Sequence, residues 1–81
     1  MKPLSDLKQG EIAYIVDLRC SVTGLEVLDL GLFPGDEIRV LYNDPSHSEM
    51  IFMNDQKLIL IQKRKANTII THLVSYEFNL N

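Results

Sequence analysis

One cysteine and two histidines, Cys20, His47 and His72, are the side chains in this sequence best suited to metal or acid–base chemistry. None of them is spaced as a ligand pair, because the chain has neither a C-x-x-C nor an H-x-x-x-H pattern. His47 lies in a polar stretch where it is expected to be solvated, and His72 opens an expected strand. The sequence therefore predicts no metal site and no cofactor.

The sequence also gives little support for covalent catalysis or for nucleotide binding. No serine stands in a G-x-S-x-G context, and a lone cysteine such as Cys20 usually serves as a small hydrophobic residue. The four glycines all fall at expected turns, so no glycine-rich phosphate loop exists. These absences predict a protein that is not an enzyme and does not bind GTP.

The composition and net charge of the chain limit the kinds of partner that it can be expected to bind. The chain has 81 residues, 46% of them apolar, which is enough for one domain with one modest core. Its net charge is −3, and the only basic run, Lys63-Arg64-Lys65, is predicted to be a solvated turn. Nucleic acid is therefore not an expected partner, since its binding rewards clustered basic residues.

The expected compartment is the cytoplasm. A single cysteine fits a reducing environment, and the first residues show no hydrophobic signal region. The longest apolar run, residues 58–61, is far too short to cross a bilayer. We therefore expect no direct membrane insertion, and any link to a membrane would come through a partner.

The predicted elements are short. A turn over residues 4–8 should bury Leu4 and Leu7, and a helix of about two turns is expected between Thr23 and Gly31. Gly31 should end this helix with a left-handed backbone, and Gly35 should lie in the turn after Pro34. A further helical turn is expected over residues 66–70. Strands are predicted at residues 11–18, 37–42, 50–53, 57–61 and 71–76.

Two of the strands carry further expectations. The apolar run in 11–18 is explained either by a bulge or by burial of both faces. In 37–42, Ile38, Val40 and Tyr42 should face one way. Five short strands and one short helix predict a mainly β fold, a small barrel over residues 1–76 with a tail at 77–81. SH3-like and oligonucleotide-binding-type barrels are the candidates, and the short segments favour the SH3-like one.

The hairpin around Asn54-Asp55-Gln56 is apolar on both faces. Alternation predicts that one set of four residues faces inward and the other outward. One set is Met50, Phe52, Leu58 and Leu60, and the other is Ile51, Met53, Ile59 and Ile61. The second set is our candidate partner-binding surface.

Three kinds of cover would suit the outward set. It could be covered by the chain itself (residues 66–70, Leu73, Phe78 or Leu80), by a second copy, or by another protein. The predicted helix adds three candidates of its own. Leu25 and Leu28 share a face, and Val27 lies off it, so an apolar side chain there is available to a partner.

The central motif of the chain resembles a known family. It consists of Leu28, Asp29, Leu30, Gly31, Leu32, Phe33, Pro34, Gly35 and Asp36. The pattern "LDLGL-x-PG" after a leucine-rich helix is similar to the FeoA family, and weaker matches continue in the family's order over residues 4–74. Two departures stand out. The chain has Thr23-Gly24-Leu25-Glu26 where family members often carry arginines, and Asn54-Asp55 where they often have a glycine.

The resemblance implies an SH3-like barrel without catalytic activity that acts beside FeoB, the membrane ferrous iron transporter with a cytoplasmic GTPase domain. The same barrel resembles the C-terminal domain of repressors of the diphtheria toxin repressor type. Our leading hypothesis is a cytoplasmic accessory protein that docks on this transporter. The alternative is a small domain that binds ferrous iron and responds to it.

Overall fold

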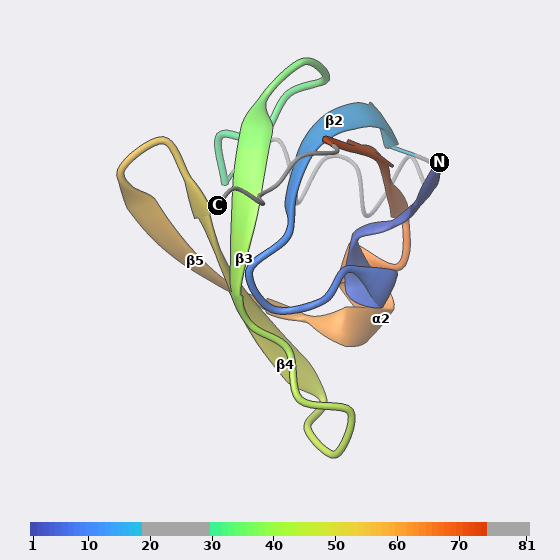
Figure 1. Cartoon of the computed structure of the whole chain (residues 1–81), viewed down its shortest axis with the longest axis vertical. Helices are drawn as coiled ribbons and strands as arrows, with labels where there is room; N and C mark the ends of the chain where they lie inside the picture. Colours follow the sequence, from blue (N-terminus) through green and yellow to red (C-terminus); the bar gives the residue numbers. More distant parts are fainter. Residues whose placement is uncertain (19–29, 75–81) are drawn as a thin grey trace, which may run out of the picture.

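The computed structural model describes residues 1–18 and 30–74 (Figure 1). The described elements are β1 (Lys2–Pro3), η1 (Leu4–Asp6), β2 (Ile12–Leu18), β3 (Glu37–Tyr42), β4 (Glu49–Asn54), β5 (Lys57–Gln62), α2 (Lys63–Ala66) and β6 (Ile69–Leu73). The strands of this part of the chain form one six-stranded antiparallel sheet in the order β1-β6-β2-β3-β4-β5. The mainly β, SH3-like prediction is confirmed. The helix predicted between Thr23 and Gly31 lies outside the described residues.

The N-terminal turn behaves as predicted. η1 is a single 3₁₀ turn that places Leu4 and Leu7 in the core, both fully buried. The side-chain amide of Asn43 donates hydrogen bonds to the carbonyl oxygens of Ser5 and Leu7, at 3.1 and 2.6 Å. These bonds satisfy backbone groups that a short helix cannot pair by itself. The turn is thereby tied to the loop after β3.

The irregular apolar run in β2 contains a bulge. Ala13 and Ile15 are buried, whereas Tyr14 and Val16 are exposed, so burial on both faces is excluded. The register between β2 and β6 shifts between Ile15 and Asp17, which is the mark of an extra residue in one strand. The alternation of β2 is therefore normal up to Ile15 and offset after it.

A second register shift corrects the prediction for Tyr42. Ile38 and Val40 are fully buried, as expected, but the pairing of β3 with β4 shifts between Val40 and Tyr42. Tyr42 pairs with Ile51, which lies between the buried residues Met50 and Phe52 and points to the other face of β4. Directly paired residues share a face of the sheet, so Tyr42 lies on the face opposite Val40.

The segment after β5 also differs from the prediction. The helical turn comprises Lys63–Ala66, so the basic run lies in α2, and residues 69 and 70 belong to β6. Ile70 pairs with both Pro3 and Asp17. This pairing on both sides of β6 outweighs the helical spacing of the local sequence. The last described strand therefore begins two residues earlier than predicted and runs over Ile69–Leu73, while residues 75 and 76 lie outside the described part of the chain.

One hydrophobic core fills the inside of the curved sheet. In Figure 1, η1 and α2 lie at one end of it, while the β4–β5 hairpin projects on the opposite side, away from β6. Thr71 is the one polar residue fully buried in the described part of the chain, and its hydroxyl donates to the Lys2 carbonyl oxygen at 2.8 Å. The core comprises Leu4, Leu7, Ala13, Ile15, Leu32, Ile38, Val40, Met50, Phe52, Ile59, Ile61, Ala66 and Ile69.

Candidate protein-binding surface

The β4–β5 hairpin has a two-residue turn. Asn54 pairs with Lys57, so only Asp55 and Gln56 form the loop, and Asp55 takes a positive φ of 59°. Aspartate tolerates this left-handed geometry better than most residues. The turn length then sets every pair further along the hairpin, including Phe52 with Ile59.

This register contradicts the predicted outward set. Ile59 and Ile61 are only 6% and 4% exposed and belong to the core, opposite Phe52 and Met50. The prediction that they face outward is wrong. A three-residue loop at 54–56 would have paired Phe52 with Leu58, and removing one residue from the loop turns β5 over.

The outward side of the hairpin consists of Ile51, Met53, Leu58 and Leu60, here called the hairpin outer face. Ile51 pairs with Leu60, and Met53 pairs with Leu58. Leu58 and Leu60 are 66% and 59% exposed, and the two β4 residues are half-buried. One face of the hairpin thus presents four large apolar residues, as the sequence predicted, although two of the four differ.

Little of the described chain covers this face. Leu73, one of the residues considered as a cover, lies in β6 opposite Ala13 and is itself exposed. Phe78 and Leu80 lie outside the described residues. Contiguous apolar patches of this kind usually mark contact sites, whereas single exposed hydrophobic residues do not.

A charged groove adjoins the hairpin outer face. Its volume is about 660 Å³. Met53 belongs to both the groove and the apolar face, so the two form one continuous surface. Acidic side chains predominate around the groove, with one arginine among them. The lining residues are Gly35, Asp36, Glu37, Ile38, Arg39, Met53, Asn54 and Asp55.

The turn of the central motif holds the base of this groove. The Asp36 carboxylate accepts a hydrogen bond from the Phe33 backbone N–H at 3.0 Å, and the Gly35 N–H donates to the Ile15 carbonyl oxygen at 2.6 Å. The side-chain amide of Asn54 reaches the Asp36 carboxylate at 3.4 Å and the Gly31 carbonyl oxygen at 3.5 Å. The motif therefore positions the hairpin against β2.

The motif residues have the backbone geometry expected of them where they are described. Gly31 and Gly35 take φ values of 82° and 96°, the left-handed region that favours glycine. Leu32 is fully buried, whereas Leu30 and Pro34 are exposed. The remaining motif and candidate residues lie outside the described part of the chain: Leu25, Val27, Leu28 and Asp29.

Gly31→Val should lower the free energy of unfolding by on the order of 1–3 kcal/mol, measured by chemical or thermal denaturation. The reason is backbone strain at a φ of 82° and not a clash, because an added Cβ would lie 3.4 Å from the flexible Lys57 Nζ. Gly31→Asn is the matched control, since asparagine accepts a left-handed backbone, and it should lose clearly less. Equal losses for the two variants would contradict the strain argument.

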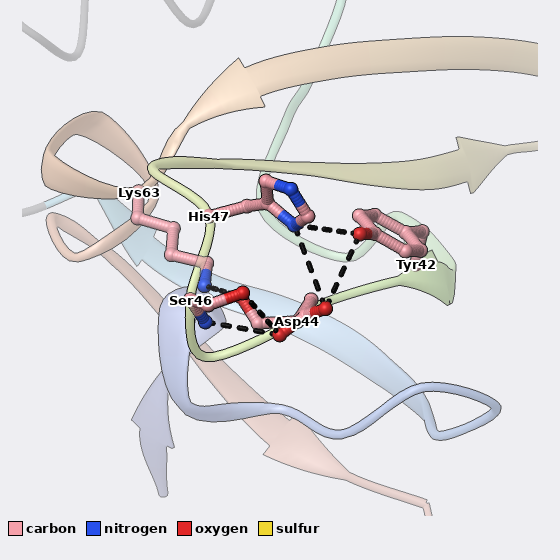
Figure 2. Close-up of polar contacts among 5 residues, drawn as sticks. All are labelled: Tyr42, Asp44, Ser46, His47 and Lys63. Carbon is pink, nitrogen blue, oxygen red and sulfur yellow. Dashed lines mark hydrogen bonds and ion pairs between the residues drawn. The ribbon is translucent and has the colours of Figure 1, made fainter.

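A polar cluster occupies the loop between β3 and β4, and Figure 2 shows its contacts. The Tyr42 hydroxyl lies 2.7 Å from His47 Nδ1, and the Asp44 carboxylate lies 3.5 Å from both. Ser46 donates to Asp44 from its backbone N–H and its hydroxyl, each at 2.9 Å. Lys63 Nζ donates to the Asp44 carbonyl oxygen at 2.5 Å. His47, expected to be merely solvated, is a hydrogen-bonded member of this cluster.

These contacts shift two ionisations. Hydrogen bonds from the Ser46 backbone and hydroxyl, and then the nearby His47, lower the pKa of Asp44. Partial loss of solvent, and then the charge of Asp44, raises the pKa of Tyr42. The contribution of Asp44 to stability is therefore present above an ordinary carboxyl pKa and is lost as the pH falls through its lowered value. The cluster braces the loop, and sequence spacing gave no signal for it beyond the polar composition.

Metal ligands do not gather in the part of the chain that is described. Over residues 1–18 and 30–74, no three histidine, cysteine, aspartate or glutamate side chains are grouped closely enough to hold an ion. His72 lies in β6 opposite Tyr14, and Cys20 is outside the described residues. Among the same residues, no helix has the length and apolar character needed to cross a membrane.

A small curved antiparallel sheet around one core, with short helices, defines a domain of the SH3-like barrel class. A family model described as "FeoA domain" matches residues 2–71. The chain belongs to the FeoA domain family. No curated protein matches the sequence.

Solved structures share the fold. A crystal structure of an iron uptake regulatory protein, FeoA, superimposes with a TM-score of 0.80 at 23% identity, over 90% of this chain and 96% of that one. An NMR structure of a FeoA-like protein from Clostridium acetobutylicum gives 0.86 at 14% identity, over 98% and 93%. Stenotrophomonas maltophilia FeoA, a prokaryotic SH3 domain protein crystallised with zinc, gives 0.72 at 17% identity, over 89% and 91%.

Proposed function

We propose that this chain is a non-enzymatic, cytoplasmic accessory protein of ferrous iron uptake that docks on the membrane transporter FeoB and supports or regulates it. The observation that carries the proposal is the FeoA family match over residues 2–71, and membership of that family supports a role in ferrous iron transport. The Stenotrophomonas maltophilia neighbour is described as a candidate ferrous iron transport activating factor. A docking role also suits a barrel whose clearest surface feature is an apolar face.

The hairpin outer face and the groove beside it are the proposed contact with the transporter. Protein interfaces combine an apolar centre with a polar rim, and here Met53 of the apolar face lines the groove together with Glu37, Arg39 and Asp55. Met53 lies where the two parts join. Its flexible thioether side chain adapts well to a partner surface. The charged groups of the groove would then fix the orientation of the partner.

Met53→Lys should weaken binding to the purified, detergent-solubilised transporter about tenfold or more, measured by biolayer interferometry. A half-buried methionine at the centre of an interface becomes a charge that must be desolvated on docking. Its long aliphatic stem still lies along the sheet, so the variant should fold.

Tyr14→Lys provides the matched control, because Tyr14 is an exposed residue of β2 and belongs to neither the hairpin nor the groove. It should bind the transporter like the parent chain. A parent chain that does not bind the transporter would overturn the proposal. Unchanged binding by Met53→Lys would show that the transporter contacts another surface of the protein.

A ferrous-iron-responsive domain is the second candidate function, and the zinc-bound Stenotrophomonas maltophilia neighbour is the observation that favours it. Anaerobic titration of ferrous iron into the purified chain, followed by calorimetry, separates the two candidates. Binding of one ion per chain with a Kd of about 1 µM or tighter would favour the sensor. We expect no saturable binding at that affinity, because the described residues do not group three ligands.

A further inference from the structure

Strand β5 ends the sheet. In the strand order it is the last member, and among the residues described it pairs with β4 along one edge and with no strand along the other. The strand Lys57–Gln62 contains no proline or glycine, and its pairing with β4 runs without a bulge. Natural edge strands usually carry a proline, a bulge or charged side chains, which prevent edge-to-edge pairing. Here Lys57 is the only charged residue in the strand.

We propose that the free edge of β5 pairs with β5 of a second copy of this chain, in antiparallel orientation, to form a two-fold symmetric dimer with a continuous sheet. The inference does not rest on the proposed function, although Leu58 and Leu60 belong to both proposed contacts. In a two-fold strand pair, residue i of one copy meets residue j of the other and residue j meets residue i, so the sequence of β5 itself decides whether the pairing suits it. Opposed residues must also share a face of the sheet.

Only a few registers satisfy these conditions, and one is clearly best. With the axis at Ile59, Leu58 of each copy opposes Leu60 of the other, and two cross-strand leucine pairs form on the outer face. With the axis at Leu60, Leu58 would oppose Gln62 of the second copy, and only one leucine pair, Leu60 with its own mate, would form. With the axis at Leu58, Ile59 would oppose Lys57, Leu60 would lie beside the turn residue Gln56, and only one leucine pair, Leu58 with its own mate, would remain. The register centred on Ile59 is the one we infer.

The exposure of the side chains agrees with this register. Leu58 and Leu60 are the two most exposed apolar residues of the hairpin, at 66% and 59%, while Ile59 lies in the core below the axis. Pairing would satisfy edge backbone groups and cover part of both leucines. The contact is small, since it involves one strand and four leucines. We therefore expect a weak dimer, with a Kd between about 1 µM and 1 mM.

A charge-exchange experiment tests the register. Sedimentation velocity is measured for the parent chain, for Leu58→Lys with Leu60→Lys, for Leu58→Glu with Leu60→Glu, and for an equal mixture of the two variants. The parent should dimerise with rising concentration. Each variant alone should be monomeric, because like charges oppose each other across the axis. The mixture should form a mixed dimer, because each lysine then opposes a glutamate.

The control is Tyr14→Lys with Val16→Lys, which alters exposed residues of β2 with the same spacing and should dimerise like the parent. Folding of every variant is checked by circular dichroism. A parent chain that stays monomeric at about 1 mM would overturn the proposal. So would lysine variants that still dimerise, or a mixture that stays monomeric. Each of these outcomes is independent of binding to the transporter, which is measured separately with Met53→Lys.

Discussion

Ile59→Lys is expected to unfold the protein, whereas Leu58→Lys, one residue earlier in the same strand, should leave it folded. Ile59 is 6% exposed and faces Phe52 in the core, so a lysine there would lose the packing and place an ammonium group among apolar atoms. Such burial costs several kcal/mol even when the lysine becomes neutral. A chain of 81 residues has a total stability of roughly 4–12 kcal/mol.

Thermal denaturation followed by far-ultraviolet circular dichroism measures both variants. We expect no cooperative transition for Ile59→Lys, or one at a much lower temperature, and a shift of no more than a few degrees for Leu58→Lys, whose side chain is 66% exposed. The comparison uses the same substitution in neighbouring positions of one strand. If Leu58→Lys unfolded and Ile59→Lys did not, the hairpin register described for β4 and β5 would be incorrect.

Phe52→Ala should be the most damaging truncation in the core. Phe52 is fully buried at the middle of β4, between Val40 of β3 and Ile59 of β5. Removing a buried phenylalanine ring typically costs about 3–5 kcal/mol, because apolar contacts are lost and a cavity remains. In a domain of this size each kcal/mol corresponds to about 4–8 °C in Tm. The expected loss is therefore about 12–40 °C, measured by calorimetry.

Phe33→Ala is the matched control, since Phe33 is 53% exposed in the turn of the central motif. The same change in side-chain size should there lower the free energy of unfolding by about 1 kcal/mol or less. Urea denaturation gives both values on one scale. Similar losses at the two positions would show that the core is not centred on β4, contrary to the burial of Phe52.

Short-range signals in the sequence determined several features correctly. The apolar residues Leu4 and Leu7 predicted a buried N-terminal turn, and Gly31 predicted a left-handed backbone. The central motif predicted the family, and the strands at 37–42 and on both sides of residues 54–56 were recognised from their composition. Each of these depends on a residue type and its immediate neighbours. Local sequence carries that information because turn geometry and strand propensity are local properties.

The sequence could not predict which residues of the hairpin face outward, since every position from Met50 to Met53 and from Leu58 to Ile61 is apolar. Without alternating polarity, only the number of residues in the turn decides which side of β5 faces inward. The structure has two turn residues, Asp55 and Gln56, so Ile59 and Ile61 are in the core. The candidate surface kept Ile51 and Met53 from the prediction and gained Leu58 and Leu60.

Pairing between strands distant in the sequence explains why Tyr42 and Ile70 differ from their predicted positions. The shift after Val40 moves Tyr42 to the outer face, where its hydroxyl reaches His47, and pairing with β1 and β2 draws Ile70 into β6 despite its helical spacing. Residue types in the sequence thus determined the family, the buried N-terminal turn and most of the strands. Only the tertiary structure decided which faces are outward, because bulges, turn lengths and strand partners become defined when distant segments pair.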